Sequence, residues 1–472
     1  MKKTLLILFL AVGSMTVLAQ HNSKVPYPDG QFNIFRVSLK DKKGSEYSLK
    51  HPERFLSEKA LKRRKRQNLP IDSTDLPLSK KYITKLTKEG LQIIGGSKWN
   101  NTVLIKSSEA YLTPQLAHLP FVTNCIKVFT APDSVFLSRI DSVVVDSAAM
   151  TETSSHRYGR GRHQIEMLNG LKLHDAGFKG DGMLIAIVDG GYMNVNRIDY
   201  FKNVNIIGQR DFVYPYTANL YDELDHGTMV LSDIGANVDG KFIGTAPHAS
   251  FILLRSEDGR TESLVEEDYW AQAVEYADSI GADVVNSSLG YSRFDDKTTN
   301  HKYVEQDGKT TLISRTASMI ANKGMLLVNS AGNEGMGTWK RTNCPADATN
   351  ILAVAALSAD SVNAKFSSVG PSYDGRVKPD VAAQGVKSTV IDGSGVITTA
   401  NGTSFASPIT CGMVACLWQA LPHKTAVEIM NLVRRSADRA STPDNIYGYG
   451  VPDYWKAYQE GINEKGRVKR KE

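Results

Sequence analysis

Residues 401–408 read N-G-T-S-F-A-S-P and lead directly into I-T-C-G-M-V-A-C-L-W-Q-A-L, an apolar run long enough for a helix. This pattern predicts a tight turn followed by a buried helix that begins at Ser404. In the first turn of a helix, free backbone N–H groups and the positive end of the helix dipole favour an oxyanion, so Ser404 is a candidate nucleophile. The alternative is that Ser404 only caps the helix, the commonest use of a serine there.

The length and composition are those of a soluble globular protein with two or three domains. The chain has 472 residues, of which 41% are hydrophobic and 22% are charged, enough to build a large core without disulfides or metals. Two basic runs, residues 62–66 and 467–471, supply much of the net charge of +6. No aromatic residues are interleaved with them to stack on bases, so we expect solvated helix faces or tails and no nucleic-acid partner.

The first nineteen residues have the organisation of a secretory signal peptide. Lys2 and Lys3 form a basic start, residues 4–12 are apolar, and small residues precede a cleavage point after Ala19. We therefore expect an exported protein, secreted or periplasmic. The apolar run after Ser404 contains a proline and several small polar residues, so we expect a buried core helix there and no membrane span.

The four cysteines do not predict a disulfide framework. Cys411 and Cys416 lie five residues apart on one expected helix, about 140° around its axis, and cannot bridge each other. Cys125 and Cys344 fall in different expected domains. One bridge, for instance between Cys344 and Cys411, remains open, but buried free thiols are the simpler expectation.

Residues 20–135 predict a small α+β domain. The expected elements are strands at 31–39, within 91–106 and at 121–129, and helices at 52–67, 79–88 and 112–119. Polar residues then indicate a linker at 136–158. This first domain contains no catalytic constellation.

From residue 159 the sequence alternates apolar β runs with helices, the pattern of a parallel α/β sheet. The expected strands are residues 183–188, 204–208, 250–254, 282–286, 325–329 and 351–356, and the expected helices are 226–236, 262–280, 313–323 and 404–420. In such sheets the working groups collect at the carboxyl ends of the strands. The polar residues at those ends therefore indicate the chemistry.

Three polar residues at such positions complete a catalytic set with Ser404. Asp189 follows an apolar strand, His226 opens a helix, and Asn333 follows another strand. Each also has an ordinary interpretation, as a turn or helix-terminal residue. Together they supply a carboxylate to hold the imidazole tautomer, a base for the serine proton, and a side-chain amide that joins the Ser404 N–H in binding an oxyanion.

The order Asp, His, Ser in the motifs I-V-D-G-G, D-H-G-T-M-V and G-T-S-F-A-S-P, with N-S-A-G-N before the last, resembles the subtilisin-like serine proteases. The resemblance covers residues 159–460 and implies an α/β fold, three-layered and subtilisin-like, with a mainly parallel central sheet. It implies a serine endopeptidase that acts through an acyl-enzyme on polypeptide substrates. The walls of its specificity pocket would be Ser288, Leu289 and Gly290 on one side and Ser330, Ala331 and Gly332 on the other.

The chain departs from the usual family motifs at three places. D-G-G stands at Asp189 where D-T-G or D-S-G is common, Met229 replaces the second histidine of H-G-T-H, and Ile409-Thr410 replace His-Val. None of these changes removes a catalytic group, so we expect retained activity.

The resemblance also implies a role for the first domain, because many secreted members carry a propeptide that assists folding, occupies the active site and is removed by the enzyme itself. Residues 20–135 suit such a ferredoxin-like propeptide domain. The expected organisation is a signal peptide at 1–19, the propeptide at 20–135, a linker with the autoprocessing site at 136–158, a peptidase domain at 159–460, and a basic C-terminal tail at 461–472.

Substrate selectivity and metal binding are less determined by the sequence. By analogy, residues 253–257 would pair with an extended substrate. An acidic run nearby either favours basic substrates or is a solvated loop and helix face, and we favour the solvated face; it consists of Glu257, Asp258, Glu262, Glu266 and Glu267. No cofactor is expected. Structural calcium, common in this family, has no assignable site, since Asp222, Glu223 and Asp225 lack a ligand spacing.

Two other classes of function stay open. A catalytically weak relative would bind peptides in the same cleft, but loss of a catalytic residue would be its mark, and none is lost. An α/β-hydrolase esterase would need a G-x-S-x-G elbow and the order Ser, acid, His, neither of which the chain has.

Overall fold

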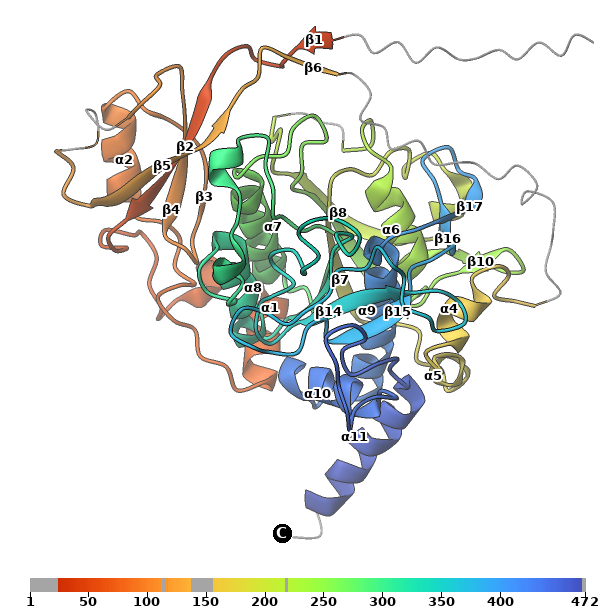
Figure 1. The fold of residues 1–472 in the computed structure, drawn as a ribbon. Coiled ribbons are helices and arrows are strands. Elements are labelled where there is room, and N and C mark those ends of the chain that lie inside the picture. Colours follow the sequence, from red (N-terminus) through yellow and green to blue (C-terminus); the bar gives the residue numbers. More distant parts are fainter. Residues whose placement is uncertain (1–23, 113–115, 117, 137–155, 217–219, 469–472) are drawn as a thin grey trace, which may run out of the picture.

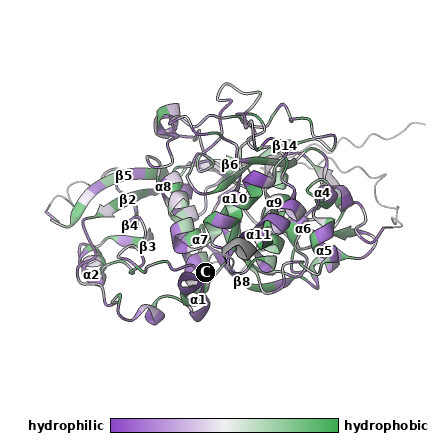
Figure 2. Cartoon of the chain, turned by 90° about the horizontal axis from the view of Figure 1, so that it is seen from below, coloured by the Kyte–Doolittle hydropathy of each residue, from purple (hydrophilic) through white to green (hydrophobic). Residues whose placement is uncertain are grey.

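The computed structural model describes the chain except residues 1–23, 113–115, 117, 137–155, 217–219 and 469–472. The expected signal peptide and most of the expected linker lie outside the described residues. The chain forms a smaller and a larger unit, with helices α7 (Glu266–Ile280) and α8 (Leu312–Met319) between them (Figure 1). From the perpendicular direction of Figure 2 the smaller unit again lies to one side.

The smaller unit is an antiparallel sheet with helices. Its strands, in the order β3-β4-β2-β5, are β2 (Asn33–Leu39), β3 (Gln92–Ser97), β4 (Thr102–Ser107) and β5 (Val122–Thr130). Helix α2 (Lys80–Lys88) begins after Ser79, whose hydroxyl accepts from the N–H of Tyr82, and it buries Tyr82 and Leu86 in the core beneath the sheet. This strand order is that of a split βαβ unit, so the expected ferredoxin-like α+β domain is confirmed.

The larger unit is built on a seven-stranded sheet in which every neighbouring pair is parallel. Its order is β15 (Val381–Gln384), β14 (Leu352–Leu357), β13 (Leu326–Ser330), β12 (Val284–Ser287), β7 (Leu184–Asp189), β11 (Ser250–Arg255) and β8 (Asn205–Asp211). All six expected strands are present. β15 was not expected as a strand, because its four residues are too few to show a pattern.

Strand β7 shows why the fold has three layers. Its side chains alternate, so Leu184, Ala186 and Val188 pack in the core with α7 and α8. Ile185 and Ile187 pack on the opposite face in a second core. Both faces are covered, as the continuous apolar runs of a buried parallel sheet require. The expected α/β fold with a parallel central sheet is therefore confirmed.

The second core is covered by several helices. These are α6 (His226–Gly235), α9 (Thr403–Ala420), α10 (Ala426–Ser436), α11 (Tyr454–Val468) and the short α4 (Arg162–Glu166) and α5 (Leu171–Asp175). Small antiparallel pairs complete the strands: β1 (Lys24–Pro26) with β6 (Ser134–Phe136), β9 (Asn237–Val238) with β10 (Phe242–Ile243), and β16 (Ser388–Ile391) with β17 (Ile397–Ala400). Single 3-10 turns occupy Pro52–Arg54, Asp199–Phe201, Lys297–Thr299, Tyr303–Glu305 and Ala321–Lys323.

Several expected helix boundaries are corrected by the structure. α7 begins at Glu266 and not at 262, because the Glu266 carboxylate accepts from the backbone N–H groups of Ser263 and Asp258 and so holds a loop before the helix. Helix α1 (Glu58–Arg66) fills only the second half of the expected helix 52–67. At the other end of the chain, α11 continues to Val468, so residues 461–468 extend a helix and do not form a tail.

The basic run 62–66 is a solvated face only in part, because Lys62, Lys65 and Arg66 are exposed and the two residues between them are not. Arg63 and Arg64 of α1 are buried against α7, where both bind the carboxylate of Asp278, and Arg64 also binds Asp75 at 2.9 Å. On β2, Arg36 forms a buried ion pair with Asp268 of α7 at 2.5 Å. The two units are therefore joined through buried charges along one helix.

All four cysteines are free in the structure. Cys344, Cys411 and Cys416 are buried and Cys125 is half-buried, so the possible bridge between Cys344 and Cys411 is not formed and the expectation of free thiols holds. Among the helices the structure describes, none has the length and apolar character needed to cross a membrane.

Candidate active site

A cleft of about 420 Å³ lies at the carboxyl ends of the central strands. Asp189 at the end of β7, His226 at the start of α6, Ser404 in the first turn of α9 and Asn333 after β13 all line it. The chain leaves β7 to form β8 and β11 on one side and then β12 on the other, so the order of the strands reverses at β7. Such a reversal opens a crevice beyond the strand ends, and the four predicted residues are brought together there.

Asp189 and His226 form a hydrogen-bonded pair. Asp189 is fully buried, and its Oδ1 accepts from His226 Nδ1 at 2.8 Å and from the N–H of Gly190 at 2.8 Å. A carboxylate only accepts, so Nδ1 carries the proton and Nε2 of the neutral ring is the free base. Among the described residues, Asp189 Oδ2 has no hydrogen-bond partner although it is buried. The hydrogen bond from Nδ1 to Asp189 holds the imidazole in the tautomer that a general base needs.

The charges around His226 keep its proton on. Burial lowers the pKa of His226, but the charge and hydrogen bond of Asp189, together with Glu257 and Asp225, raise it further in the opposite direction, to about 9. The protonated ring therefore predominates at neutral pH. The neutral ring becomes abundant only in alkaline solution.

Ser404 is fixed on the floor of the cleft. Its hydroxyl donates to the carbonyl oxygen of Ser288 at 3.3 Å and not to His226, and the Ser288 hydroxyl donates to the Ser404 carbonyl at 2.8 Å. One turn further along α9, Ser407 donates to Asn286 of β12 at 2.9 Å. These bonds lock the start of α9 against the end of β12. Transfer of the serine proton to His226 requires the hydroxyl to turn away from Ser288.

Asn333 is oriented by its neighbour in α9. Its Oδ1 accepts from the backbone N–H of Thr403 and from the Thr403 hydroxyl, both at 3.0 Å. With the oxygen fixed in this way, the amide nitrogen is left as a donor on an exposed side chain beside Ser404. Gly332 precedes it with φ of 105°, and a Cβ there would meet Ser368 Oγ at 2.9 Å, so this turn needs glycine.

Five of the six residues expected to form the walls of the specificity pocket line the cleft. Ser288, Leu289 and Gly290 follow β12. Ser330 is the last residue of β13, and Gly332 lies two residues beyond it. The side chain of Ala331 is fully buried and does not line the cleft, because the backbone of this residue bonds to Val354 and Asn343 behind the wall.

Of two expectations about substrate contacts, one is wrong in part and the other is wrong. Within the expected stretch 253–257, residues 253–255 are paired on both sides, with β7 and with β8, so they have no free edge for a peptide, whereas pairing of residues 256 and 257 with a substrate stays a prediction. The acidic run is not a solvated face either. Asp258 is buried and accepts from Tyr27, Tyr214 and Arg260, and the buried Glu267 lies 2.6 Å from His301. Only Glu257 and Glu262 of this run line the cleft.

The structure adds residues that the sequence did not single out. Thr403 orients Asn333, and Leu224 lines the cleft with a left-handed backbone, φ of 51°. Glu257, which the sequence singled out only as part of the acidic run, reaches the same wall, where its Oε2 lies 3.8 Å from the position a Cβ on Gly190 would take. A positive φ at a leucine leaves no signal in the sequence, whereas the threonine next to the candidate nucleophile was visible there.

Two of the three acidic residues considered for calcium are engaged by other groups. Glu223 binds Arg255 at 2.7 Å and Arg260 at 3.0 Å, so its charge is already compensated. Asp225 accepts from the N–H of Gly393 at 3.0 Å. Within the described part of the chain, no group of three or more His, Cys, Asp or Glu residues has the arrangement to hold a metal.

Comparisons with known proteins agree with this geometry. Residues 180–450 match the subtilase family of peptidase S8, and residues 35–138 match a peptidase S8 propeptide domain of Bacteroidota. An alkaline protease of Alkalihalobacillus alcalophilus is 27% identical over 361 residues, which are 75% of this chain and 84% of that protein. Serine protease AprX of Bacillus subtilis is 28% identical over 379 residues, 74% of this chain and 78% of that protein. Among solved structures, the epidermin leader peptide processing serine protease of Staphylococcus aureus has the same fold, with a TM-score of 0.62, 18% identity, and coverage of 91% of this chain and 98% of that one.

Proposed function

The chain belongs to the subtilase family, and we therefore propose that it is an exported serine endopeptidase that hydrolyses peptide bonds with Asp189, His226 and Ser404 as its catalytic triad. The observation that carries this proposal is the 2.8 Å pairing of His226 with the buried Asp189 in the cleft that Ser404 and Asn333 also line. A serine hydroxyl is a weak nucleophile until a base accepts its proton.

In the proposed reaction, His226 Nε2 accepts the proton of Ser404 as the serine oxygen bonds to the substrate carbonyl carbon. The imidazolium that forms is stabilised by Asp189, which keeps its charge. The negative oxygen of the tetrahedral intermediate is bound by the N–H of Ser404 and the amide of Asn333. His226 then donates its proton to the leaving amine, and a water molecule, deprotonated by the same ring, hydrolyses the acyl-enzyme.

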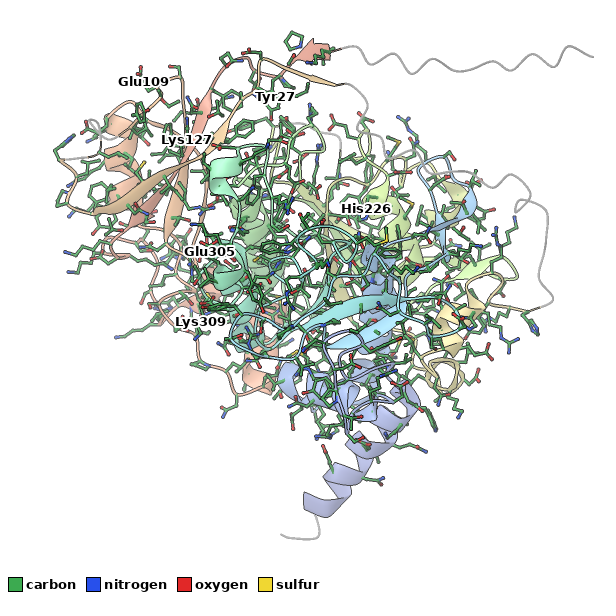
Figure 3. The ribbon with its side chains drawn as sticks, in the orientation of Figure 1. Tyr27, Glu109, Lys127, His226, Glu305 and Lys309 are labelled. Carbon is green, nitrogen blue, oxygen red and sulfur yellow. The ribbon has the colours of Figure 1, made fainter. Side chains whose placement is uncertain are left out.

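The smaller unit suits the role of an inhibitory propeptide that the enzyme itself removes. Thr261 and Glu262 line both the active-site cleft and a second hollow against β5 of the smaller unit, so the two units meet beside the cleft. Tyr27, labelled in Figure 3, donates to Asp258 at 2.7 Å from the same side. The smaller unit therefore contacts the rim of the cleft, and we propose self-cleavage between residues 136 and 158. A signal peptide at 1–19 would direct export.

Labelling with a fluorophosphonate probe, together with casein cleavage, tests the proposal. We expect the processed protein to be labelled and to cleave casein, and the Ser404→Ala variant to do neither and to accumulate uncut. The Ser441→Ala variant, which removes an exposed serine far along the chain, is the matched control and should behave as the wild type. Processed protein that is not labelled at Ser404 would refute the peptidase. Normal maturation of Ser404→Ala without another protease would refute self-cleavage alone.

The alternative is a catalytically weak relative that binds peptides in the same cleft. The bond from the Ser404 hydroxyl to Ser288, in place of His226, favours it. This alternative predicts peptide binding without turnover, and turnover of casein that depends on Ser404 would exclude it.

A further inference from the structure

Glu257 is a carboxylate in the cleft that the proposed mechanism does not use. It follows β11, is half-buried, and lines the cleft together with His226 and Ser404. Among the described residues, no hydrogen bond or ion pair engages its carboxylate; only its backbone carbonyl accepts, from Arg255. A partly desolvated charge without a partner is costly, so this position favours the arrival of a cation.

The neighbouring cations do not supply that partner. Arg255 directs its guanidinium to Asp211 and Glu223, and Arg260 directs its own to Asp258 and Glu223. Burial, followed by the charge of Asp189, raises the pKa of Glu257 to about 7, and the nearby His226 and Arg255 lower it only in part. The residues that line the cleft include no Lys or Arg, while Glu262 and Glu334 add further negative charge.

The position of Glu257 relative to a bound peptide follows from the strand geometry of the substrate. The residue whose carbonyl is attacked (P1) directs its side chain between the walls Ser288–Gly290 and Ser330–Gly332. In an extended peptide, successive side chains point to opposite faces. We infer that the preceding residue (P2) faces the side of the cleft that holds His226, Leu224 and Glu257, where Leu224 and Glu257 both lie within 4 Å of the position a Cβ on Gly190 would take, beside Asp189.

We propose that Glu257 makes the enzyme select Lys or Arg at P2, by pairing its carboxylate with the substrate cation. This inference rests on the proposed peptidase function. It differs from a general attraction of the cleft for basic peptides, because the effect belongs to one substrate position and one side chain.

Peptides that differ only at P2 test the inference. With the processed enzyme, we expect kcat/KM for Arg at P2 to exceed that for Met by about tenfold, the effect of one charge pair at a partly exposed site. Glu257→Gln should bring this ratio to about one, and Glu257→Arg should make Glu at P2 the better substrate. The ratio is the essential measurement, because loss of Glu257 also lowers the pKa of His226 and changes both rates together.

Titration of active sites with the fluorophosphonate probe corrects each rate for misfolded protein. Glu334→Gln is the matched control, since it removes a carboxylate from another part of the cleft and should leave the P2 ratio unchanged, whatever its effect on the absolute rates. Equal cleavage of the Arg and Met peptides by the wild type would overturn the inference while leaving the peptidase function standing. A ratio unchanged in Glu257→Gln, or abolished in Glu334→Gln, would also overturn it. Absence of cleavage and labelling with every peptide would instead refute the proposed function.

Discussion

The pH dependence of peptide cleavage probes the environment of His226 directly. With a pKa of about 9, only about one ring in a hundred is neutral at pH 7. In the proposed mechanism the neutral ring is the base that activates Ser404, so kcat/KM should rise about tenfold per pH unit from pH 6 to 8 and level off above about 9.5. Glu257 is charged throughout the upper part of this range, because its own pKa is about 7.

The raised pKa of His226 also makes the stability of the folded protein depend on pH, in the direction opposite to the activity. The folded protein holds the proton on His226 above the ordinary pKa of 6.5, so this group stabilises the fold in full below pH 6.5, and that contribution is lost as the pH rises through about 9. Activity should therefore be greatest where the Asp189–His226 pair stabilises the protein least. Unfolding of the Ser404→Ala protein in denaturant at pH 6 and pH 10 measures this difference without self-digestion.

The assay follows initial rates of a chromogenic peptide at concentrations well below KM, with active-site-titrated enzyme at constant ionic strength. Samples returned from each pH to pH 8 show whether activity has been lost irreversibly. Glu257→Gln should move the midpoint to lower pH, since Glu257 is one of the charges that raise the pKa of His226. A wild-type midpoint near 6.5 would refute the electrostatic reasoning, because the charge of Asp189 at 2.8 Å would then have no net effect.

Three substitutions and one control substitution give further predictions. Asn333→Ala should lower kcat by about 10²–10³, the measured effect of losing one oxyanion donor in subtilisin, with unchanged binding of a product peptide; a loss below tenfold would contradict its role. Arg64→Ala removes one cation from two buried carboxylates, of which Asp278 keeps Arg63 and Asp75 keeps Lys323, so it should destabilise the Ser404→Ala precursor by about 3 kcal/mol in urea unfolding, the lower end for a broken buried pair. The nearby Arg66→Ala, which removes a more exposed charge 3.6 Å from its partner, should cost at most about 1 kcal/mol, and equal effects would argue against burial as the cause. Gly332→Ala should destabilise by about 1–3 kcal/mol, because alanine is strained at φ of 105° and its Cβ meets Ser368; an unchanged unfolding midpoint would show that this turn can adapt.

The central sheet and the members of the site were predictable from the sequence, because each depends on a local pattern. The apolar runs of β7 and β12 are long enough to recognise, and the residues at their carboxyl ends had to meet. α10 was missed although its signal was present: Thr425, directly before the helix, and Glu428, in its first turn, form a capping box.

The buried charges were not predictable, because their partners lie far apart in the sequence. Arg64 and Asp278 are 214 residues apart, and Arg36 and Asp268 are 232 residues apart. Composition alone predicted a solvated face for the run 62–66, and this prediction is wrong for Arg63 and Arg64. The same reasoning predicted a solvated face for the acidic run around Asp258, which is mostly buried. For Asn333, the residue was found from its motif, but its orientation by Thr403 depends on the folded turn.

The smaller unit contributes basic residues that pair with acidic residues of α7, and the net charges of the two parts of the chain are opposite as well. Residues 20–135 contain 20 Lys and Arg against 10 Asp and Glu, whereas residues 136–472 contain 34 against 40. The positive net charge of the chain thus comes from the propeptide, and the part that carries the proposed triad has a net charge of −6 by the same count. Departure of the propeptide would change the net charge from positive to negative. At neutral pH, the precursor should therefore bind a cation exchanger, and the mature enzyme should bind an anion exchanger. If the propeptide is cleaved and stays bound, it is held by a protein of opposite charge, and salt should then speed its release.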